Sequence, residues 1–134
     1  MKFTKRIFLI LIACAITTNI CAIQFRHLSI KDGLSQLSVL SIYQDKLGRM
    51  WFGTEEGINV FDGNNLTAIK TLRNIPPQNL EVRWICGDEK GNIYFQLGTS
   101  IVCIDFATQS NTVLVKKGVT TLCHHSGKIY YASR

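Results

Sequence analysis

The sequence predicts an all-β protein made of repeated four-stranded units, and three observations support this prediction. Short runs rich in β-branched and aromatic residues alternate with turns marked by glycine, asparagine or aspartate. The chain matches itself when it is shifted by 43 residues, so that Val39 falls on Val82 and Asp45 on Asp88. No segment after residue 22 shows a sustained helical period. Four short antiparallel strands in each unit of about 40 to 45 residues are typical of a β-propeller blade.

The first 22 residues are expected to be a secretory signal peptide and not part of the fold. Basic residues precede an uninterrupted apolar core at residues 7–16, and Ala22 gives a small-residue cleavage position. This core is too short for a transmembrane helix, which needs about 20 apolar residues. An uncleaved membrane anchor and a lipid attached at Cys14 are the alternatives.

The net charge gives no sign of a nucleic acid partner. Three of the 15 Lys and Arg residues lie in the signal peptide, so residues 23–134 carry 12 basic and 9 acidic side chains. The longest basic run is Lys116-Lys117, whereas a nucleic-acid site needs a clustered basic patch with aromatic residues between the charges. The charges are therefore expected on a solvated surface. No cofactor is expected either.

Three cysteines lie outside the signal peptide, at Cys86, Cys103 and Cys123. They show no CxxC spacing of the kind used for zinc or redox chemistry. Free, buried thiols are favoured, because cysteine is among the most buried residue types. An exported compartment would also permit one disulfide.

Blade 1 is predicted at residues 39–81. It follows residues 23–38, in which a first strand at Phe25–Ile30 would complete the last blade of a closed propeller. Gly48 and Gly57 stand at tight turns, where glycine can take a positive φ. The four strands of blade 1 are expected at residues 39–45, 49–54, 58–61 and 66–72.

Blade 2 is predicted at residues 82–118 and the start of blade 3 at residues 119–134. Two and a half blades cannot close a ring. The chain is therefore expected to expose strand edges and to associate, either with further blades of a longer protein or with other copies of itself. The strands of blade 2 are expected at Val82–Cys86, Asn92–Gln96, Ile101–Asp105 and Thr112–Val115.

The repeat resembles that of the two-component-regulator propellers. Residues 39–62 fill the family's pattern almost completely, including the step Gly53-Thr54. In the second copy Gln96-Leu97-Gly98 replaces that step, and in the third copy His124-His125-Ser126 replaces the acidic turn. The residues to which the resemblance assigns a structural role are Asp45, Gly48, Trp51, Gly53, Thr54, Gly57, Asp62, Asp88, Gly91, Tyr94, Asp105, Gly127 and Tyr130.

The resemblance implies the N-terminal, periplasmic part of a hybrid two-component histidine kinase and response regulator that senses oligosaccharides. In such sensors, many blades precede a transmembrane helix and a kinase. The 134 residues contain neither a phosphoacceptor region nor a second hydrophobic span. This part is therefore expected to be non-catalytic and to meet the membrane only through its signal peptide or through parts outside the sequence.

A ligand is expected over the central channel, at the loops that enter each inner strand and the loops that join the second and third strands. Arg83 and Trp84 are the first choice, because both residue types are common anchors of binding sites. A partly buried tryptophan beside a surface arginine, with no ligand, is the simpler alternative. The candidate ligand-binding residues are Arg83, Trp84, Glu81, Glu55, Glu56 and Gln36.

Catalytic and metal sites are not expected. Glu55 and Glu56 are adjacent, so their side chains point apart and cannot flank one bond. His124 and His125 have no third ligand at a suitable spacing, and a solvated turn is favoured for them. The alternatives to a sensor are a secreted propeller enzyme, such as a lyase or glycosidase, and a truncated fragment without activity of its own.

The periodic aromatic and acidic residues are expected to be structural. Trp51 has its counterparts in Tyr94 and Tyr130, so it is expected to pack between neighbouring blades. Asp45 and Asp88 each precede a glycine turn, where an aspartate bonds to backbone amides.

Overall fold

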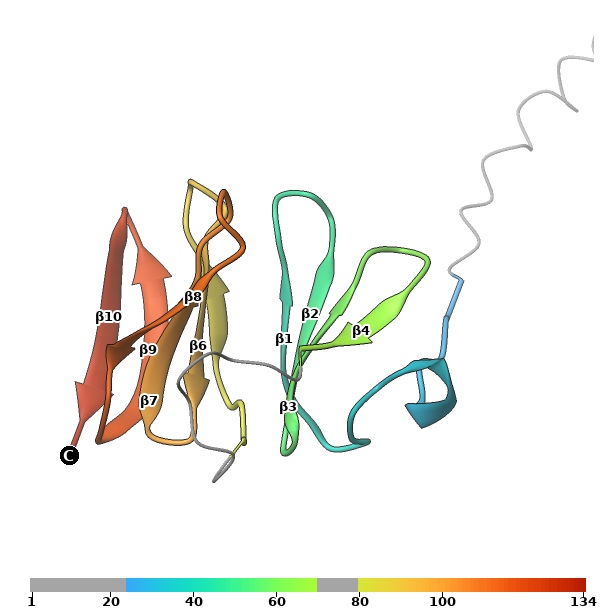
Figure 1. The fold of residues 1–134 in the computed structure, drawn as a ribbon, viewed down its shortest axis with the longest axis horizontal. Helices are drawn as coiled ribbons and strands as arrows, with labels where there is room; N and C mark the ends of the chain where they lie inside the picture. Colours follow the sequence, from blue (N-terminus) through green and yellow to red (C-terminus); the bar gives the residue numbers. More distant parts are fainter. Residues whose placement is uncertain (1–23, 70–79) are drawn as a thin grey trace, which may run out of the picture.

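The computed structural model describes residues 24–69 and 80–134. Within these residues, ten strands form three antiparallel sheets that stand side by side in a row (Figure 1). The all-β fold of four-stranded units that the sequence predicts is therefore confirmed. We call the three sheets blade 1, blade 2 and blade 3 in chain order.

Blades 1 and 2 are meanders in which each strand pairs with the next along the chain. Blade 1 consists of β1 (Val39–Gln44), β2 (Met50–Thr54), β3 (Gly57–Phe61) and β4 (Leu66–Ala68). Blade 2 consists of β5 (Ile85–Gly87), β6 (Ile93–Leu97), β7 (Ser100–Ile104) and β8 (Asn111–Val115). Blade 3 is a hairpin of β9 (Val119–His125) and β10 (Lys128–Ser133). Apart from β4 and β5, the strands of blades 1 and 2 lie within one residue of their predicted bounds; the predicted end of β4 lies outside the described residues.

The prediction that β5 begins at Val82 is wrong. The backbone of Val82 forms hydrogen bonds to the neighbouring blade. Its N–H donates to the carbonyl of Thr54 at 2.9 Å, and its carbonyl accepts from Ser41 Oγ at 3.2 Å. Both partners belong to blade 1. Regular pairing inside blade 2 therefore starts only at Ile85.

Residues 24–38 contain no strand, so the strand expected at Phe25–Ile30 is wrong for this chain. The segment crosses a face of blade 1 and carries one short 3-10 helix, η1 (Ile30–Asp32). Phe25 is 94% exposed, whereas Leu34 is buried and the Ser35 N–H donates to Asn59 Oδ1 at 3.0 Å. These contacts hold the segment against the face of the sheet, and Gly33 also lies beside the outer strand β4, where a Cβ on it would be 2.5 Å from the Leu66 carbonyl oxygen. Its expected role in closing a propeller stays a prediction.

The main hydrophobic core lies between blades 1 and 2. Trp51 is only 3% exposed there, which confirms its expected position between neighbouring blades. Its counterpart Tyr94 is partly buried, but Tyr130 on the last strand is 51% exposed. The buried residues of this core are Trp51, Ile58, Val82, Ile93, Phe95, Leu97, Val102 and Ile104. A smaller core of Ile101, Val119 and Leu122 joins blades 2 and 3.

The hairpin of blade 3 turns on Ser126 and Gly127, whose φ angles are 49° and 74°. Two consecutive positive φ angles are typical of a tight hairpin turn. His125 pairs with Lys128 beside this turn and is exposed, but the side chain of His124 is only 10% exposed. The expectation of a solvated turn is therefore wrong for His124, because that residue belongs to β9 and is covered by blade 2.

Candidate functional site

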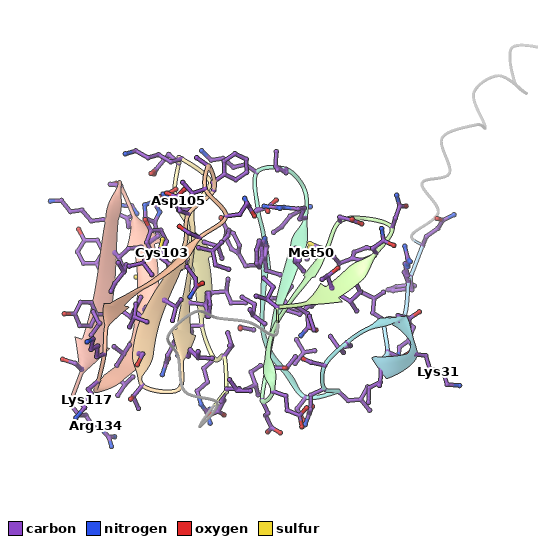
Figure 2. The ribbon with its side chains drawn as sticks, in the orientation of Figure 1. Lys31, Met50, Cys103, Asp105, Lys117 and Arg134 are labelled. Carbon is purple, nitrogen blue, oxygen red and sulfur yellow. The ribbon has the colours of Figure 1, made fainter. Side chains whose placement is uncertain are left out.

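The loops that the sequence analysis named as ligand candidates lie at one end of the blades. This end is at the lower edge of Figure 1, and we call it the loop face. Lys117 and Arg134 lie at the same end of blade 3 (Figure 2). The loop face comprises residues 35–38, 55–57, 80–84, 98–99 and 116–118.

Gln36 and Glu55 are in direct contact on the loop face. Gln36 Nε2 donates to Glu55 Oε2 at 2.9 Å, which joins the segment before β1 to the β2–β3 turn. Thr54 fixes this turn, because its hydroxyl donates to the Gly57 carbonyl at 3.0 Å and accepts from the Glu56 N–H at 3.1 Å. Glu56 is exposed beside them.

Glu81 and Arg83 form an ion pair at the start of blade 2. Arg83 Nη2 lies 2.6 Å from Glu81 Oε1, and the two side chains are 57% and 28% exposed. The adjacent Trp84 is 45% exposed, the largest exposed aromatic surface on the loop face. Because the Val82 N–H bonds to Thr54, this group lies next to the β2–β3 turn. The structure thus brings all six candidate residues to one end of blades 1 and 2.

Ser41 is the residue of blade 1 that corresponds to Trp84 in blade 2, and it helps to join these two blades. In blade 1, the Ser41 hydroxyl donates to the carbonyl of Val82 in blade 2. A Cβ on Gly53, the cross-strand partner of Ser41, would lie 2.4 Å from that carbonyl oxygen. Glycine at residue 53 therefore allows the two blades to approach closely.

At the junction of blades 2 and 3, a different side chain makes the same bond. In blade 2, Trp84 corresponds to Ser41 and Gln96 corresponds to Gly53. Trp84 and Gln96 are likewise cross-strand partners, because the Trp84 carbonyl accepts from the Gln96 N–H at 3.0 Å. Gln96 Nε2 donates to the Val119 carbonyl at 3.0 Å and to the Gly98 carbonyl at 2.7 Å. The second repeat thus departs from the family's Gly-Thr step at Gln96 because the Gln96 side chain makes the junction hydrogen bond that Ser41 makes in blade 1. In this junction the side-chain hydrogen bond to the next blade therefore comes from Gln96 and not from Trp84.

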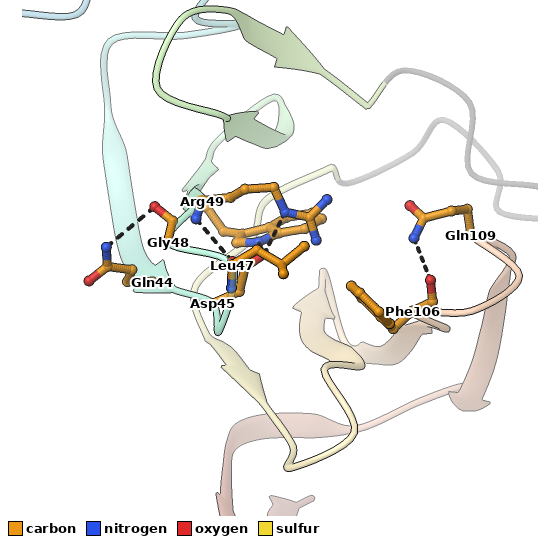
Figure 3. Close-up of polar contacts among 8 residues, drawn as sticks. Gln44, Asp45, Leu47, Gly48, Arg49, Phe106 and Gln109 are labelled. Carbon is orange, nitrogen blue, oxygen red and sulfur yellow. Dashed lines mark hydrogen bonds and ion pairs between the residues drawn. The ribbon is translucent and has the colours of Figure 1, made fainter.

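The opposite end of the blades holds two nearly identical aspartate turns (Figure 3 shows the first). Asp45 Oδ1 accepts the backbone N–H groups of Leu47 and Arg49 at 2.9 and 3.0 Å. Asp45 Oδ2 accepts Arg49 Nε at 2.7 Å and Trp51 Nε1 at 2.9 Å. Although burial alone would raise the pKa of the Asp45 carboxyl, the bonds from Trp51 and Arg49 hold it below its ordinary value.

Asp88 repeats this arrangement residue by residue. Its Oδ1 accepts from the N–H groups of Lys90 and Asn92, both at 2.9 Å, and its Oδ2 accepts Asn92 Nδ2 at 2.8 Å and the Tyr94 hydroxyl at 2.9 Å. Burial, followed by the bond to Asp88, raises the pKa of Tyr94 to about 12. Both aspartates make the backbone bonds expected of them. Sequence reasoning missed the aromatic donor, although an N–H or O–H at six residues after the aspartate recurs in both copies.

Contacts between neighbouring turns join the blades at this end. Lys46 Nζ donates to the Glu89 carbonyl, and His124 Nε2 lies 3.4 Å from Glu89 Oε2. Each blade therefore contacts the next one along the row. These three residues form a polar seam, which we place with the structural contacts.

The described residues offer few side chains for metal binding or for thiol chemistry. Among residues 24–69 and 80–134, no three His, Cys, Asp or Glu side chains come together as a metal site. Cys86 and Cys103 are partly buried and free, and burial raises the pKa of Cys86 to about 12. Cys123 is exposed, so the expectation of a buried thiol is wrong for it. No helix in the described part of the chain has the length and apolar character of a membrane span.

Comparison with known proteins assigns the repeat. Residues 33–56 match the family model described as the two component regulator propeller. The chain is 43% identical over 58 residues to histidine kinase P4 of Formosa agariphila, a match that covers 43% of this chain and 4% of that kinase.

Two solved structures from B. thetaiotaomicron have a similar fold. The extracellular domain named for a hybrid two component system, BT3049, is 28% identical with a TM-score of 0.61, covering 73% of this chain and 16% of that one. The extracellular domain named for a one component system, BT4673, is 14% identical with a TM-score of 0.66, covering 81% and 16%. The chain thus spans a small part of each of these relatives. The expected resemblance to the two-component-regulator propeller repeat is thus confirmed, and the family model places it at residues 33–56.

Proposed function

We propose that this chain is part of the signal-input region of a two-component sensor, exported to the periplasmic side of the membrane, where its loop face contributes to recognition of an oligosaccharide. The observation that carries the proposal is the likeness of the repeats to an extracellular domain of a hybrid two component system at 28% identity. The match to a histidine kinase over 58 residues supports the same assignment.

The loop face has the chemistry that a sugar ligand needs. The exposed ring of Trp84 offers a flat apolar surface for the C–H face of a pyranose ring, as indole does in many binding sites. The neighbouring Glu81 and Arg83 provide an acceptor and a donor for hydroxyl groups. Glu55 and Gln36 add a second polar pair next to them. These groups can bind and orient a ligand without reacting with it.

Hydrolysis of a glycoside is the function that this geometry supports least. A glycosidase places two carboxylates on opposite sides of one bond. Glu55 and Glu56 are consecutive in the β2–β3 turn, and Glu81 is paired with Arg83. The proposed function is therefore binding. A secreted lyase or glycosidase is the alternative that the experiment below also tests.

Isothermal titration calorimetry with a panel of neutral and acidic oligosaccharides tests the proposal. We expect one oligosaccharide class to bind the chain and Trp84→Ala to weaken that binding at least about tenfold, which corresponds to about 1.4 kcal/mol. Leu47→Ala is the matched control, because Leu47 is also exposed but lies at the opposite end of blade 1.

Three results would contradict the proposal. Binding that survives Trp84→Ala unchanged would move the ligand away from this site. Absence of binding across the whole panel would reject an oligosaccharide for this part of the chain. Release of shortened sugars during the titration, detected by chromatography, would identify an enzyme instead.

A further inference from the structure

The first, inner strand of each blade has one extra residue close to the loop face. The extra residues are Leu40 in blade 1, Arg83 in blade 2 and Thr120 in blade 3, and we call them the rim residues. We infer that the rim residues contact one oligosaccharide that lies along the inner strands of several blades, so that Leu40 and Thr120 bind ligand together with Arg83. This inference rests on the proposed function, because it extends the ligand site around Trp84 to the neighbouring blades.

The strand pairing shows the extra residue in blades 1 and 3. Leu40 lies between Val39 and Ser41, and the partners of these two residues are adjacent on β2. The residues on either side of Thr120 are likewise paired with adjacent residues of β10. In both blades the inner strand therefore has one residue more than the strand beside it, which is the definition of a β-bulge.

The segment that leads into β5 has the same bulge. The Glu81 carbonyl accepts a hydrogen bond from the Gly98 N–H at 2.9 Å, and the Trp84 carbonyl accepts one from the Gln96 N–H at 3.0 Å. Between these two bonds, two residues of the inner segment lie opposite one residue of the neighbouring chain. The bulge thus recurs at the same place in three consecutive blades. Bulges often lie next to functional sites, where they change the direction of a side chain.

The bulge removes the rim residues from both faces of the sheet. In a regular strand, residues on the same face are two positions apart. Val82 and Ile85 are three positions apart, yet both pack into the core between blades 1 and 2. Val119 and Leu122 are also three apart, and both pack into the core between blades 2 and 3. The extra residue in each strand therefore belongs to neither core.

The rim residues are exposed along one edge of the row of blades. The inner strands are the edges of their sheets, and β5 has Cα atoms within 8 Å of both β1 and β9. Leu40 is 37% exposed, the Arg83 side chain is 57% exposed, and Thr120 is exposed. Blade 2 has a neighbour on each side, so the exposure of Arg83 does not come from an open face. It is a property of the bulge position.

The three side chains offer different groups to a ligand. Leu40 offers only apolar surface. Arg83 offers only donors, and Glu81 holds its guanidinium at 2.6 Å. The Thr120 hydroxyl donates to the Ala132 carbonyl at 3.3 Å and can still accept a hydrogen bond. The matching ligand has apolar surface, an acceptor and a hydroxyl group in a row, which the C–H faces and hydroxyls of linked sugar rings provide.

The length of the edge favours a ligand of several rings. Strands of different blades lie farther apart than the paired strands of a sheet, so three inner strands extend over more than about 10 Å. One sugar ring is shorter than this edge. We therefore expect a ring on Trp84 and Arg83 to be held by blade 2 alone, and further rings to reach Leu40 in blade 1 or Thr120 in blade 3.

Isothermal titration calorimetry with a size series, from the disaccharide to the tetrasaccharide of each class in the panel, tests the inference. The affinity of the wild type is expected to increase with ligand length. Leu40→Ala and Thr120→Val are each expected to weaken binding of the tetrasaccharide about fivefold or more, as truncation of an interface contact does, and to reduce the gain in affinity with length. The rim residues are exposed, so both variants are expected to fold.

Two matched controls make the same side-chain changes away from the rim. Ile42→Ala alters the inner strand of blade 1, where Ile42 is 60% exposed but lies on a face of the sheet. Thr112→Val alters an exposed threonine of β8, a strand at the other edge of blade 2. Both controls are expected to bind the tetrasaccharide as the wild type does.

The outcomes separate this inference from the proposed function. Binding that is weakened by Trp84→Ala but unchanged in Leu40→Ala and Thr120→Val would overturn the inference and leave the proposed function standing. An affinity that does not rise with length, or an equal loss in the two controls, would also overturn it. A wild type that binds no sugar rejects the proposed function, and the inference with it. Circular dichroism identifies any variant that has lost its fold; Leu40→Ser and Thr120→Ala then replace it.

Discussion

Replacing Asp45 by asparagine is expected to destabilise the chain more than the same change at Asp88. The Asp45 carboxylate accepts four hydrogen bonds, of which two reach its Oδ2 from Arg49 Nε and Trp51 Nε1. An asparagine has one acceptor oxygen, so either this pair of donors or the pair of backbone N–H groups faces an amide N–H₂. The indole N–H of Trp51 can only donate, and Trp51 is 3% exposed.

The size of the effect follows from the unpaired donors. A buried donor without an acceptor costs about 1 to 3 kcal/mol, so Asp45→Asn is expected to lower the free energy of unfolding by about 2 kcal/mol. For a domain of this size, that corresponds to a Tm lower by about 10 °C. Asp88→Asn is expected to cost about 1 kcal/mol, because the Tyr94 hydroxyl can also accept a hydrogen bond from the new amide.

Urea unfolding followed by circular dichroism measures both variants under the same conditions. The comparison is close, since each carboxylate accepts two backbone N–H groups and two side-chain donors from the same positions of its turn. Arg49→Asn in both backgrounds removes the one further difference, which is the ion pair of Asp45 with Arg49. Equal losses in the two variants, or a larger loss in Asp88→Asn, would refute the reasoning that the donor-only indole decides the difference.

Three further predictions follow from contacts described above. The pKa values of Asp45 and Asp88 are lowered in the folded state. Their contribution to stability is therefore present at neutral pH and is lost as the pH falls below about 4. In unfolding experiments at a series of pH values, the stability of Asp45→Asn should fall less steeply with acid than that of the wild type. Gln96→Ala removes the bond to the Val119 carbonyl and should lower the free energy of unfolding by about 1 to 2 kcal/mol. Adding Trp84→Ser should recover part of this loss, because a serine hydroxyl makes the corresponding bond in blade 1. Additive effects of the two substitutions in a double-mutant cycle would contradict this exchange of partners. Gly87→Ala places a methyl group against Tyr43 and should cost about 2 kcal/mol, a loss that Tyr43→Cys should reduce in thermal unfolding.

The strands could be predicted from the sequence because their signals are local. Alternating apolar residues and glycine turns placed all but two of the eight strands in blades 1 and 2 within one residue of their bounds. The position of Trp51 also followed from the period, since a residue that recurs at the same place in each blade meets the same neighbour. The aspartate turns followed from a residue type that bonds to nearby amides.

Several of the failures involve contacts between blades. Val82 has the β-branched side chain of a strand residue, but its backbone bonds to blade 1. His124 has the polarity of a turn residue, yet its side chain is covered by the neighbouring blade. The exchange of Ser41 for Gln96 involves residues on different strands of different blades. No pattern within one repeat carries such information, because the partner is about 40 residues away.

The exchange of partners at Gln96 has a consequence for how such repeats can change over time. Where the junction bond comes from the inner strand, as it does at Ser41, a mutation of that residue is expected to weaken the fold. Where the bond comes from the second strand, the inner-strand residue is released from this constraint. Trp84 occupies such a released position. Different side chains can therefore occupy this position of the loop face while the blades stay joined.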